Sequence, residues 1–212
     1  MFSAIFDMDG TLLDTQQIYI PAWEDSGAKQ GIKGVGEHIS NVCGMNEAGW
    51  TSYLETHFPT LDIQSFKQNV LEYISENGVI RLKEGALELL DFLKSKNIKM
   101  AVASGASTES IIRNLKEVGV FNYFGAFAGS LDVENGKPAP DVFLLAAKRL
   151  GVAPEECFVF EDSANGIKAG YRAGMKCIGV PDVAEFDSDI KAIMFAELKS
   201  LDEAIELLRN ME

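Results

Sequence analysis

Short apolar runs alternate with helical patterns after residue 78, and this alternation constrains the fold more than any other feature of the sequence. The runs have the length and composition of buried strands, and the segments between them show a helical spacing of apolar residues. Strands are expected at 98–103, 124–128, 157–160 and 176–180, and helices at 84–95, 108–118, 140–150 and 164–173. The alternation predicts a parallel sheet with helices on both faces, an α/β fold.

The C-terminal end carries weaker signals of the same kind. A short strand is expected near 192–195. Ser200 and Glu203 have the spacing of a capping box, so they are expected to open a final helix that turns Leu207 and Leu208 inward.

The N-terminal run 2–6 is also typical of a buried strand, but a long helical segment separates it from the next one. Helices are expected there at 16–29, 46–57 and 63–76, with no strand between them. We therefore predict that the first strand joins the sheet and that the helical segment is an inserted cap. The expected division is a core of 1–14 and 79–212 and a small α-helical cap domain of 15–78.

The charge of the chain limits its partners. The formal net charge is −13, from 32 acidic and 19 basic residues. Such a field repels nucleic acid and anionic membrane surfaces, so neither is expected as a partner. The field also repels a phosphorylated metabolite, and any site for an anion would therefore need a local cation.

The sequence also allows expectations about the cellular compartment and the oligomeric state of the protein. It has no apolar stretch of about 18 residues or more, so no membrane span is expected. The first strand follows the N-terminus at once, without the pattern of a secretory signal. The three cysteines are far apart and are typical of reduced thiols. We expect a cytoplasmic monomer.

Polar side chains follow four successive strands at the points where the strands end. Because the carboxyl ends of parallel strands meet at one edge of a sheet, these side chains are expected to converge there. Each signal alone has a structural alternative, since Asp and Gly form turns and Ser caps helices. The groups are Asp7 and Asp9, the segment 104–107 with Ser104 and Gly105, Lys137 between Gly136 and Pro138, and Glu161 with Asp162.

The chemistry of this set favours a phosphate ligand held with a metal ion. Acidic ligands that offer only oxygen favour a hard cation such as Mg²⁺, which typically also takes phosphate oxygens. The lysine and the serine would hold the remaining oxygens. A metal ion and Lys137 would also let an anionic ligand approach in spite of the charge of the chain.

The same residues resemble the four motifs of the haloacid dehalogenase-like (HAD) superfamily, and the resemblance covers nearly the whole chain. The segments 136–141 and 160–167 are most similar to the branch that contains β-phosphoglucomutase and small sugar-phosphate phosphatases. The resemblance implies a Rossmann-like three-layer core with a helical cap after the first motif. The matching residues are Asp7, Asp9, Gly10, Thr11, Ser104, Lys137, Glu161 and Asp162.

The resemblance also implies a role for each residue. Asp7 would be the nucleophile that takes up the phosphoryl group as an aspartyl phosphate, and Asp9 would protonate the leaving alcohol and then deprotonate the attacking water. Mg²⁺ would be held by Asp7, Asp162 and the backbone carbonyl of Asp9, with Glu161 nearby. The transferring phosphoryl group would be bound by Ser104, Gly105, Lys137 and Thr11.

Three activities and a non-catalytic role compete within this resemblance. A Mg²⁺-dependent phosphatase of a small phosphorylated metabolite, such as a sugar phosphate, needs only the residues named above. A β-phosphoglucomutase-type mutase also carries a cap histidine and a phosphate-gripping arginine, but this chain has Tyr19 and Asn46-Glu47 at those places. A dehalogenase needs neither Asp9 nor the metal pair, and a binding protein would be expected to lack Asp7 or Asp9. The phosphatase is therefore the favoured prediction.

The cap is expected to supply the substrate side of the site. Candidates for that surface are Trp23, His38, Asn46 and Trp50, although a packing role is favoured for both tryptophans.

Overall fold

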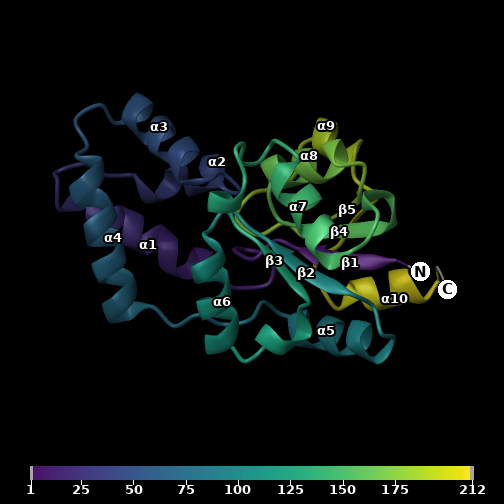
Figure 1. Ribbon diagram of the computed structural model, residues 1–212. Coiled ribbons are helices and arrows are strands. Elements are labelled where there is room, and N and C mark those ends of the chain that lie inside the picture. Colours follow the sequence, from purple (N-terminus) through teal and green to yellow (C-terminus); the bar gives the residue numbers. More distant parts are fainter. Residues whose placement is uncertain (1, 211–212) are drawn as a thin grey trace.

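Six parallel strands form a single sheet at the centre of the computed structural model, which describes residues 2–210 (Figure 1). The strand order is β3-β2-β1-β4-β5-β6, so the N-terminal strand lies in the middle. This is the order of a doubly wound, Rossmann-like sheet, and it confirms the predicted α/β class. The strands are β1 (Ser3–Phe6), β2 (Met100–Ala103), β3 (Ala126–Ala128), β4 (Cys157–Glu161), β5 (Lys176–Gly179) and β6 (Ala196–Glu197).

Helices cover both faces of the sheet and make it the middle of three layers. Because side chains alternate along a strand, Ala4 and Phe6 face one helical layer and Ile5 faces the other. The first layer contains α5 (Ala86–Ser95), α6 (Thr108–Glu117) and α10 (Glu203–Arg209). The second contains α7 (Asp141–Leu150), α8 (Ala164–Arg172) and α9 (Ser188–Lys191).

The register between β1 and β4 places two acidic residues side by side. Phe6 pairs with Phe160, and their rings stack with centroids 4.7 Å apart. The backbone N–H of Asp7 donates to the carbonyl of Phe160 at 2.9 Å. Asp7 and Glu161, which directly follow Phe6 and Phe160, therefore lie side by side at the carboxyl edge of the sheet.

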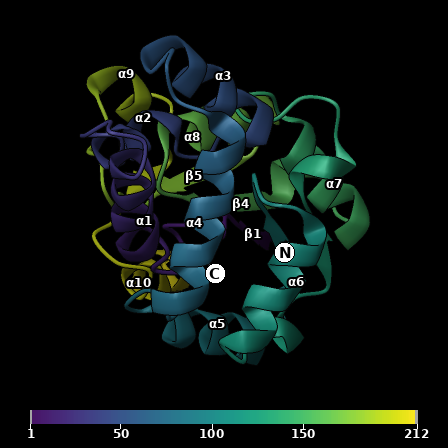
Figure 2. The same ribbon diagram turned by 90° about the vertical axis from the view of Figure 1, so that its left-hand side faces the viewer.

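The helical segment after β1 lies beyond that edge, on the side away from both termini (Figure 1). Figure 2 shows it facing the viewer, with α1 and α4 packed lengthwise. Its apolar side chains form a cluster of their own, in which the Trp23 ring meets Phe66 edge-on at 5.4 Å. The helices are α1 (Gln16–Ala28), α2 (Ile39–Val42), α3 (Glu47–His57) and α4 (Ile63–Asn77).

This separate cluster supports the division into a core of 1–14 and 79–212 and a cap of 15–78, which remains our proposal. We use the word cap for 15–78 below. Within residues 2–210, no helix has the length and hydropathy needed to cross a membrane. Short 3-10 turns lie at Gly36–His38, Phe121–Tyr123, Ser130–Asp132 and Pro154–Glu156.

Two details near the C-terminus differ from the sequence-based expectations. The last strand is β6 at 196–197, and the segment expected as a strand near 192–195 instead follows α9, whose N-cap is Asp187. The capping box of Ser200 and Glu203 is wrong as well. Asp202 is the N-cap of α10, and the Glu203 carboxylate accepts the backbone N–H of Lys199 at 2.9 Å. Leu208 is buried and Leu207 packs against the core, as expected.

Candidate active site

Lys137 joins two of the strand ends at the carboxyl edge of the sheet. Its ammonium lies 2.5 Å from Asp7 Oδ1 and 2.7 Å from Glu161 Oε2, and it also donates to the carbonyl of Ala103 at 3.3 Å. Asp7 directly follows β1, Ala103 and Glu161 are the last residues of β2 and β4, and Lys137 lies in the segment between β3 and α7. The predicted convergence of the strand ends is therefore present for these residues.

Three buried carboxylates surround this ammonium on one side. Asp7, Glu161 and Asp162 each offer an oxygen, and these oxygens lie within 4.8 Å of one another. Three carboxylates against one ammonium leave an excess of negative charge, which a divalent cation would offset. The donors are all oxygen, and Mg²⁺ is bound by such sets. The residues present therefore fit the expected metal ion.

Hydrogen bonds hold the two carboxylates at the end of β4, those of Glu161 and Asp162, in place. The Thr11 hydroxyl donates to Asp162 Oδ1 at 3.0 Å. The backbone N–H and the hydroxyl of Ser163 both donate to Glu161 Oε1, at 3.0 and 2.7 Å. The hydroxyl of Thr11, expected to bind phosphate, is thus engaged by a carboxylate of the proposed metal site.

The crowding of charge shifts the acid–base equilibria of this group. Burial, followed by the charge of Glu161, raises the pKa of Asp7 well above its ordinary value, and the same two causes raise the pKa of Asp162. Burial lowers the pKa of Lys137, but the charges of Asp7 and Glu161 outweigh it, so the pKa is raised overall. A bound cation would lower the pKa of both aspartates.

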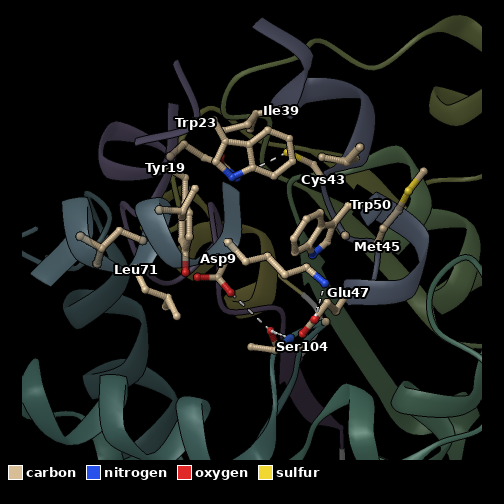
Figure 3. A pocket seen from close by; sticks show the side chains of 18 of the residues that line it. Asp9, Tyr19, Trp23, Ile39, Cys43, Met45, Glu47, Trp50, Leu71 and Ser104 are labelled. Carbon is tan, nitrogen blue, oxygen red and sulfur yellow. Dashed lines mark hydrogen bonds and ion pairs between the residues drawn. The ribbon is translucent and has the colours of Figure 1, made fainter. Parts of the chain in front are cut away.

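Asp9 stands apart from the three carboxylates. Its Oδ2 lies 3.5 Å from the Ser104 hydroxyl, while its Oδ1 is buried without a hydrogen-bond partner among the described residues. Burial raises the pKa of Asp9. Figure 3 shows Asp9 and Tyr19 of the cap pointing toward one another. The two aspartates of the first motif therefore have different surroundings, although one residue separates them.

Gly10 allows Asp162 to approach the turn after β1. Its φ is +86°, a conformation that favours glycine, and a Cβ at this position would overlap the Asp162 carboxylate. The backbone of the turn and the carboxylate after β4 are therefore in direct contact. Any residue other than glycine would push the proposed metal site apart.

A pocket of about 420 Å³ lies between the carboxyl edge of the sheet and the cap (Figure 3). Asp7, Asp9 and Ser104 line it from the core, together with Gly105. The cap contributes side chains from α1, α2, the segment before α3, α3 itself and α4. These include Gln16, Tyr19, Trp23, Cys43, Met45, Glu47, Trp50, Phe66, Lys67, Val70, Leu71 and Ile74.

The expectations for the cap are met only in part. Trp23 and Trp50 pack against each other with ring centroids 5.6 Å apart, and both also line the pocket. His38 does not line it and instead lies 2.8 Å from the Tyr53 hydroxyl. Asn46 is the N-cap of α3. Sequence reasoning missed Gln16, Glu47 and Lys67 as lining residues, because nothing in their local pattern distinguishes them from other polar residues of helices.

The segment 43–46 of the cap packs tightly against the core. The carbonyl of Cys43 accepts from the Asn165 side chain at 3.2 Å. A Cβ on Gly105 would lie 2.7 Å from the carbonyl oxygen of Met45, and a Cβ on Gly136 would lie 2.7 Å from Asn46 Nδ2. These close approaches hold the segment against the core beside the pocket, which Cys43 and Met45 line.

Comparison with known proteins relates the chain to one family. The family model of haloacid dehalogenase-like hydrolases matches residues 3–174. A "Phosphorylated carbohydrates phosphatase" of Thermotoga maritima is 33% identical over 215 residues, covering 100% of this chain and 99% of the relative. "Fructose-1-phosphate phosphatase YqaB" of Escherichia coli is 34% identical, covering 83% of this chain and 94% of the relative.

Solved structures share the fold along its whole length. A crystal structure of a "putative beta-phosphoglucomutase from Thermotoga maritima" superposes with a TM-score of 0.77 and 29% identity. The match covers 100% of both chains. The likeness therefore extends over both the sheet and the helical segment beyond its edge.

Proposed function

The chain belongs to the haloacid dehalogenase-like hydrolase family, and on this premise we propose that it is a Mg²⁺-dependent phosphatase of a small phosphorylated metabolite, a sugar phosphate above all. The observation that carries the proposal is the placement of Asp7 beside Lys137, with Asp9 on the floor of the same pocket. The printed names of two relatives, both phosphatases of phosphorylated carbohydrates, support the substrate class.

Asp7 and Asp9 would divide the reaction between them. A carboxylate oxygen of Asp7 attacks phosphorus, the bond to the ester oxygen breaks, and the proton of Asp9 goes to the leaving alcohol. Asp9 then takes a proton from water, whose oxygen attacks the aspartyl phosphate and releases inorganic phosphate and Asp7. The raised pKa of Asp9 supports its holding a proton at the start.

Mg²⁺ would be held by Asp7, Asp162 and the backbone carbonyl of Asp9, with Glu161 behind them. When bound, it would neutralise charge on the phosphoryl oxygens. Asp9 contributes no side-chain oxygen to the buried carboxylate group, which fits a contact through its carbonyl. The hydrogen bonds from Thr11 and Ser163 would orient Asp162 and Glu161 toward the ion.

The transferred phosphoryl group would contact Ser104, Gly105, Lys137 and Thr11. All three hydrogen-bond donors of Lys137 already have acceptors, of which the carbonyl of Ala103 is the most distant at 3.3 Å. A phosphoryl oxygen would most easily replace that carbonyl. Since the Thr11 hydroxyl donates to Asp162, its part in phosphate binding would be indirect.

A mutase is the second candidate, because a similar structure carries the name of a putative β-phosphoglucomutase. The lining of the pocket favours hydrolysis. Tyr19 and Glu47 lie in it where a mutase would carry a histidine and an arginine, and Glu47 cannot grip a phosphate. We also propose that the protein acts as a monomer in the cytoplasm. The free thiols of Cys43, Cys157 and Cys177 support the reducing compartment.

The test is phosphate release from a panel of phosphorylated metabolites, with Mg²⁺ and with excess chelator. We expect release that needs Mg²⁺ and is abolished in Asp7→Asn. Activity of Asp7→Asn within tenfold of wild type would refute the assignment of the nucleophile. β-Glucose 1-phosphate with a trace of bisphosphate tells the two candidates apart, since isomerisation without phosphate release would establish the mutase.

A further inference from the structure

An ion pair lines the pocket on the cap side. Lys67 of α4 lies 2.7 Å from the carboxylate of Glu47 on α3, and its ammonium sits 5.0 Å from the centre of the Trp50 ring, also on α3. Figure 3 shows Glu47 and Trp50 on the same side of the pocket. We call these two charges the Glu47–Lys67 pair. The positive charge of Lys67 is thus already matched by an acid and an aromatic face.

Lys67 is the one cation among the described residues that line this pocket. The other charged side chains in the lining are the acids Asp7, Asp9 and Glu47. The phosphoryl group has its own cations, namely Lys137 and the proposed metal ion, at the floor. A second anionic group on the same substrate would therefore meet no unmatched positive charge among the lining side chains. Arg113 on α6, whose charge reaches Tyr19, is exposed and lies outside the lining.

The rest of the wall suits an uncharged molecule. Most of it is apolar, with Trp23, Phe66 and Val70 among the side chains that face the space. Gln16 adds a neutral polar group: it is 6% exposed, and its Oε1 is buried without a partner among the described residues. An unpartnered amide oxygen accepts a hydrogen bond from a hydroxyl and repels an anion.

Resting on the phosphatase function proposed above, we propose that the substrate is a monophosphate whose alcohol part is uncharged, and that the Glu47–Lys67 pair excludes a second phosphate or a carboxylate. The Glu47 side chain is 69% exposed and that of Lys67 is 32% exposed, so the pair adds little to stability. The Glu47–Lys67 pair instead affects the electrostatic potential of the pocket. A second anion would have to approach Glu47 in order to reach Lys67, and like charges in close contact are unfavourable.

The experiment compares substrates that differ in whether the alcohol part carries a second anionic group. The first pair is fructose 1-phosphate and fructose 1,6-bisphosphate, and the second is glycerol 3-phosphate and 3-phosphoglycerate. Phosphate release gives kcat/KM for each, at low and high ionic strength. The variants are Glu47→Gln, which frees Lys67, and Glu55→Gln, a control that removes the same charge from an exposed position on the same helix outside this pocket.

We expect wild type to prefer the uncharged alcohol by about tenfold or more in kcat/KM. Glu47→Gln should reduce that preference roughly two- to fivefold at low ionic strength, less at high ionic strength, and Glu55→Gln should leave it unchanged. Equal kcat/KM within each pair for wild type would overturn this proposal and leave the phosphatase intact. A substrate preference that is unaltered in Glu47→Gln would overturn the role of the Glu47–Lys67 pair. No release from any of the four compounds, nor from the wider panel, would overturn both proposals.

Discussion

The ammonium of Lys137 lies 2.5 Å from Asp7 Oδ1, although 130 positions separate the two residues in the chain. Both side chains are almost completely buried, and Glu161 shares the same ammonium. The contact exists because parallel strands bring β1, β4 and the loop after β3 to one edge of the sheet. The stability of the fold and the chemistry of the candidate site therefore depend on the same charges, those of Lys137, Asp7 and Glu161.

Replacing Lys137 by Met should therefore destabilise the fold severely. The change leaves Asp7, Glu161 and Asp162 buried together without their ammonium, and removing one partner of a buried ion pair costs about 3–5 kcal/mol. The free energy of unfolding in urea measures the loss. Lys191→Met is a suitable control, because Lys191 pairs with Glu197 at 2.9 Å on the surface, where a pair contributes about 1 kcal/mol or less. Equal losses for the two variants would contradict the interpretation of Lys137 as the counter-ion of the site.

Mg²⁺ should stabilise the protein through the three buried carboxylates. For a Kd of about 1 mM, 10 mM Mg²⁺ would add about 1.4 kcal/mol to the free energy of unfolding. Asp162→Asn should remove most of this gain, while Asp182→Asn should keep it. Thermal unfolding with Mg²⁺ and with sodium at equal ionic strength distinguishes binding from screening. A gain of the same size in Asp162→Asn would place the cation elsewhere.

Gly44→Ala should weaken both the fold and catalysis. The φ of Gly44 is +77°, and a Cβ there would overlap the Ser163 hydroxyl, where the cap meets the core. Gly31 has the same φ of +77°, but a Cβ on it would have nothing within 4 Å, so Gly31→Ala carries the backbone strain alone. The strain costs about 1 kcal/mol in either variant.

The difference between the two glycine variants isolates the contact of the cap with the core. Unfolding in urea should show a larger loss for Gly44→Ala, and kcat/KM should fall in that variant and stay near wild type in Gly31→Ala. Equal behaviour of the two variants in both measurements would show that the segment 43–46 does not need its close approach to Ser163.

The order and type of most elements followed from the sequence because their patterns are local. A run such as 157–160 is apolar at every position, as a strand buried on both faces requires, and the polar residues that follow it mark its end. The prediction misplaced the strand β6 because the strand is too short to leave a local pattern. It has two residues, Ala196 and Glu197, and so short a segment has no periodicity to recognise.

The floor of the candidate site was predictable, and its walls were not. Asp7 and Lys137 follow strands and Glu161 ends one, and the parallel sheet alone brings strand ends together. Glu47 and Lys67 belong to two helices whose placement depends on the packing of the cap, including the contact of Trp23 with Phe66. A contact between residues 20 positions apart on separate helices leaves no trace in either local pattern.

The pH dependence of stability should carry a contribution from Asp132. A hydrogen bond from Arg149, at 2.8 Å, is the largest of the effects that lower the pKa of Asp132 to about 2, and the Thr108 hydroxyl adds to it. A carboxyl group with a lowered pKa in the folded state stabilises the protein above its unfolded pKa of about 3.8, and this contribution disappears as the pH falls to about 2.

Asp132→Asn should therefore be less stable than wild type at pH 7, and the gap should close between about pH 4 and pH 2. Urea unfolding across this range measures the gap, with Glu134→Gln as a control of equal charge change on an exposed neighbour. A gap that stays constant down to pH 2 would show that the carboxylate charge is not what stabilises the loop after β3.

Asp9 has two proposed roles, as the acid for the leaving alcohol and as the base for water, and substrates with different leaving groups separate them. A leaving alcohol of high pKa needs a proton from Asp9, whereas p-nitrophenolate leaves readily without one, and general acid catalysis contributes about 10²–10⁴-fold. Asp9→Asn should therefore lose activity on a sugar phosphate to that extent, and still release p-nitrophenol from p-nitrophenyl phosphate in its first turnover. The aspartyl phosphate then hydrolyses slowly, since no base activates water.

Rapid mixing of Asp9→Asn with p-nitrophenyl phosphate should accordingly show a burst of about one equivalent of p-nitrophenol, followed by a slow steady rate. Asp7→Asn should show no burst, because it lacks the nucleophile that would be phosphorylated. If Asp9→Asn lost the burst as well, Asp9 would be required for phosphorylation itself. Loss of the first-turnover rate by the same factor on both substrates would then refute the assignment of Asp9 as the acid that protonates the leaving group.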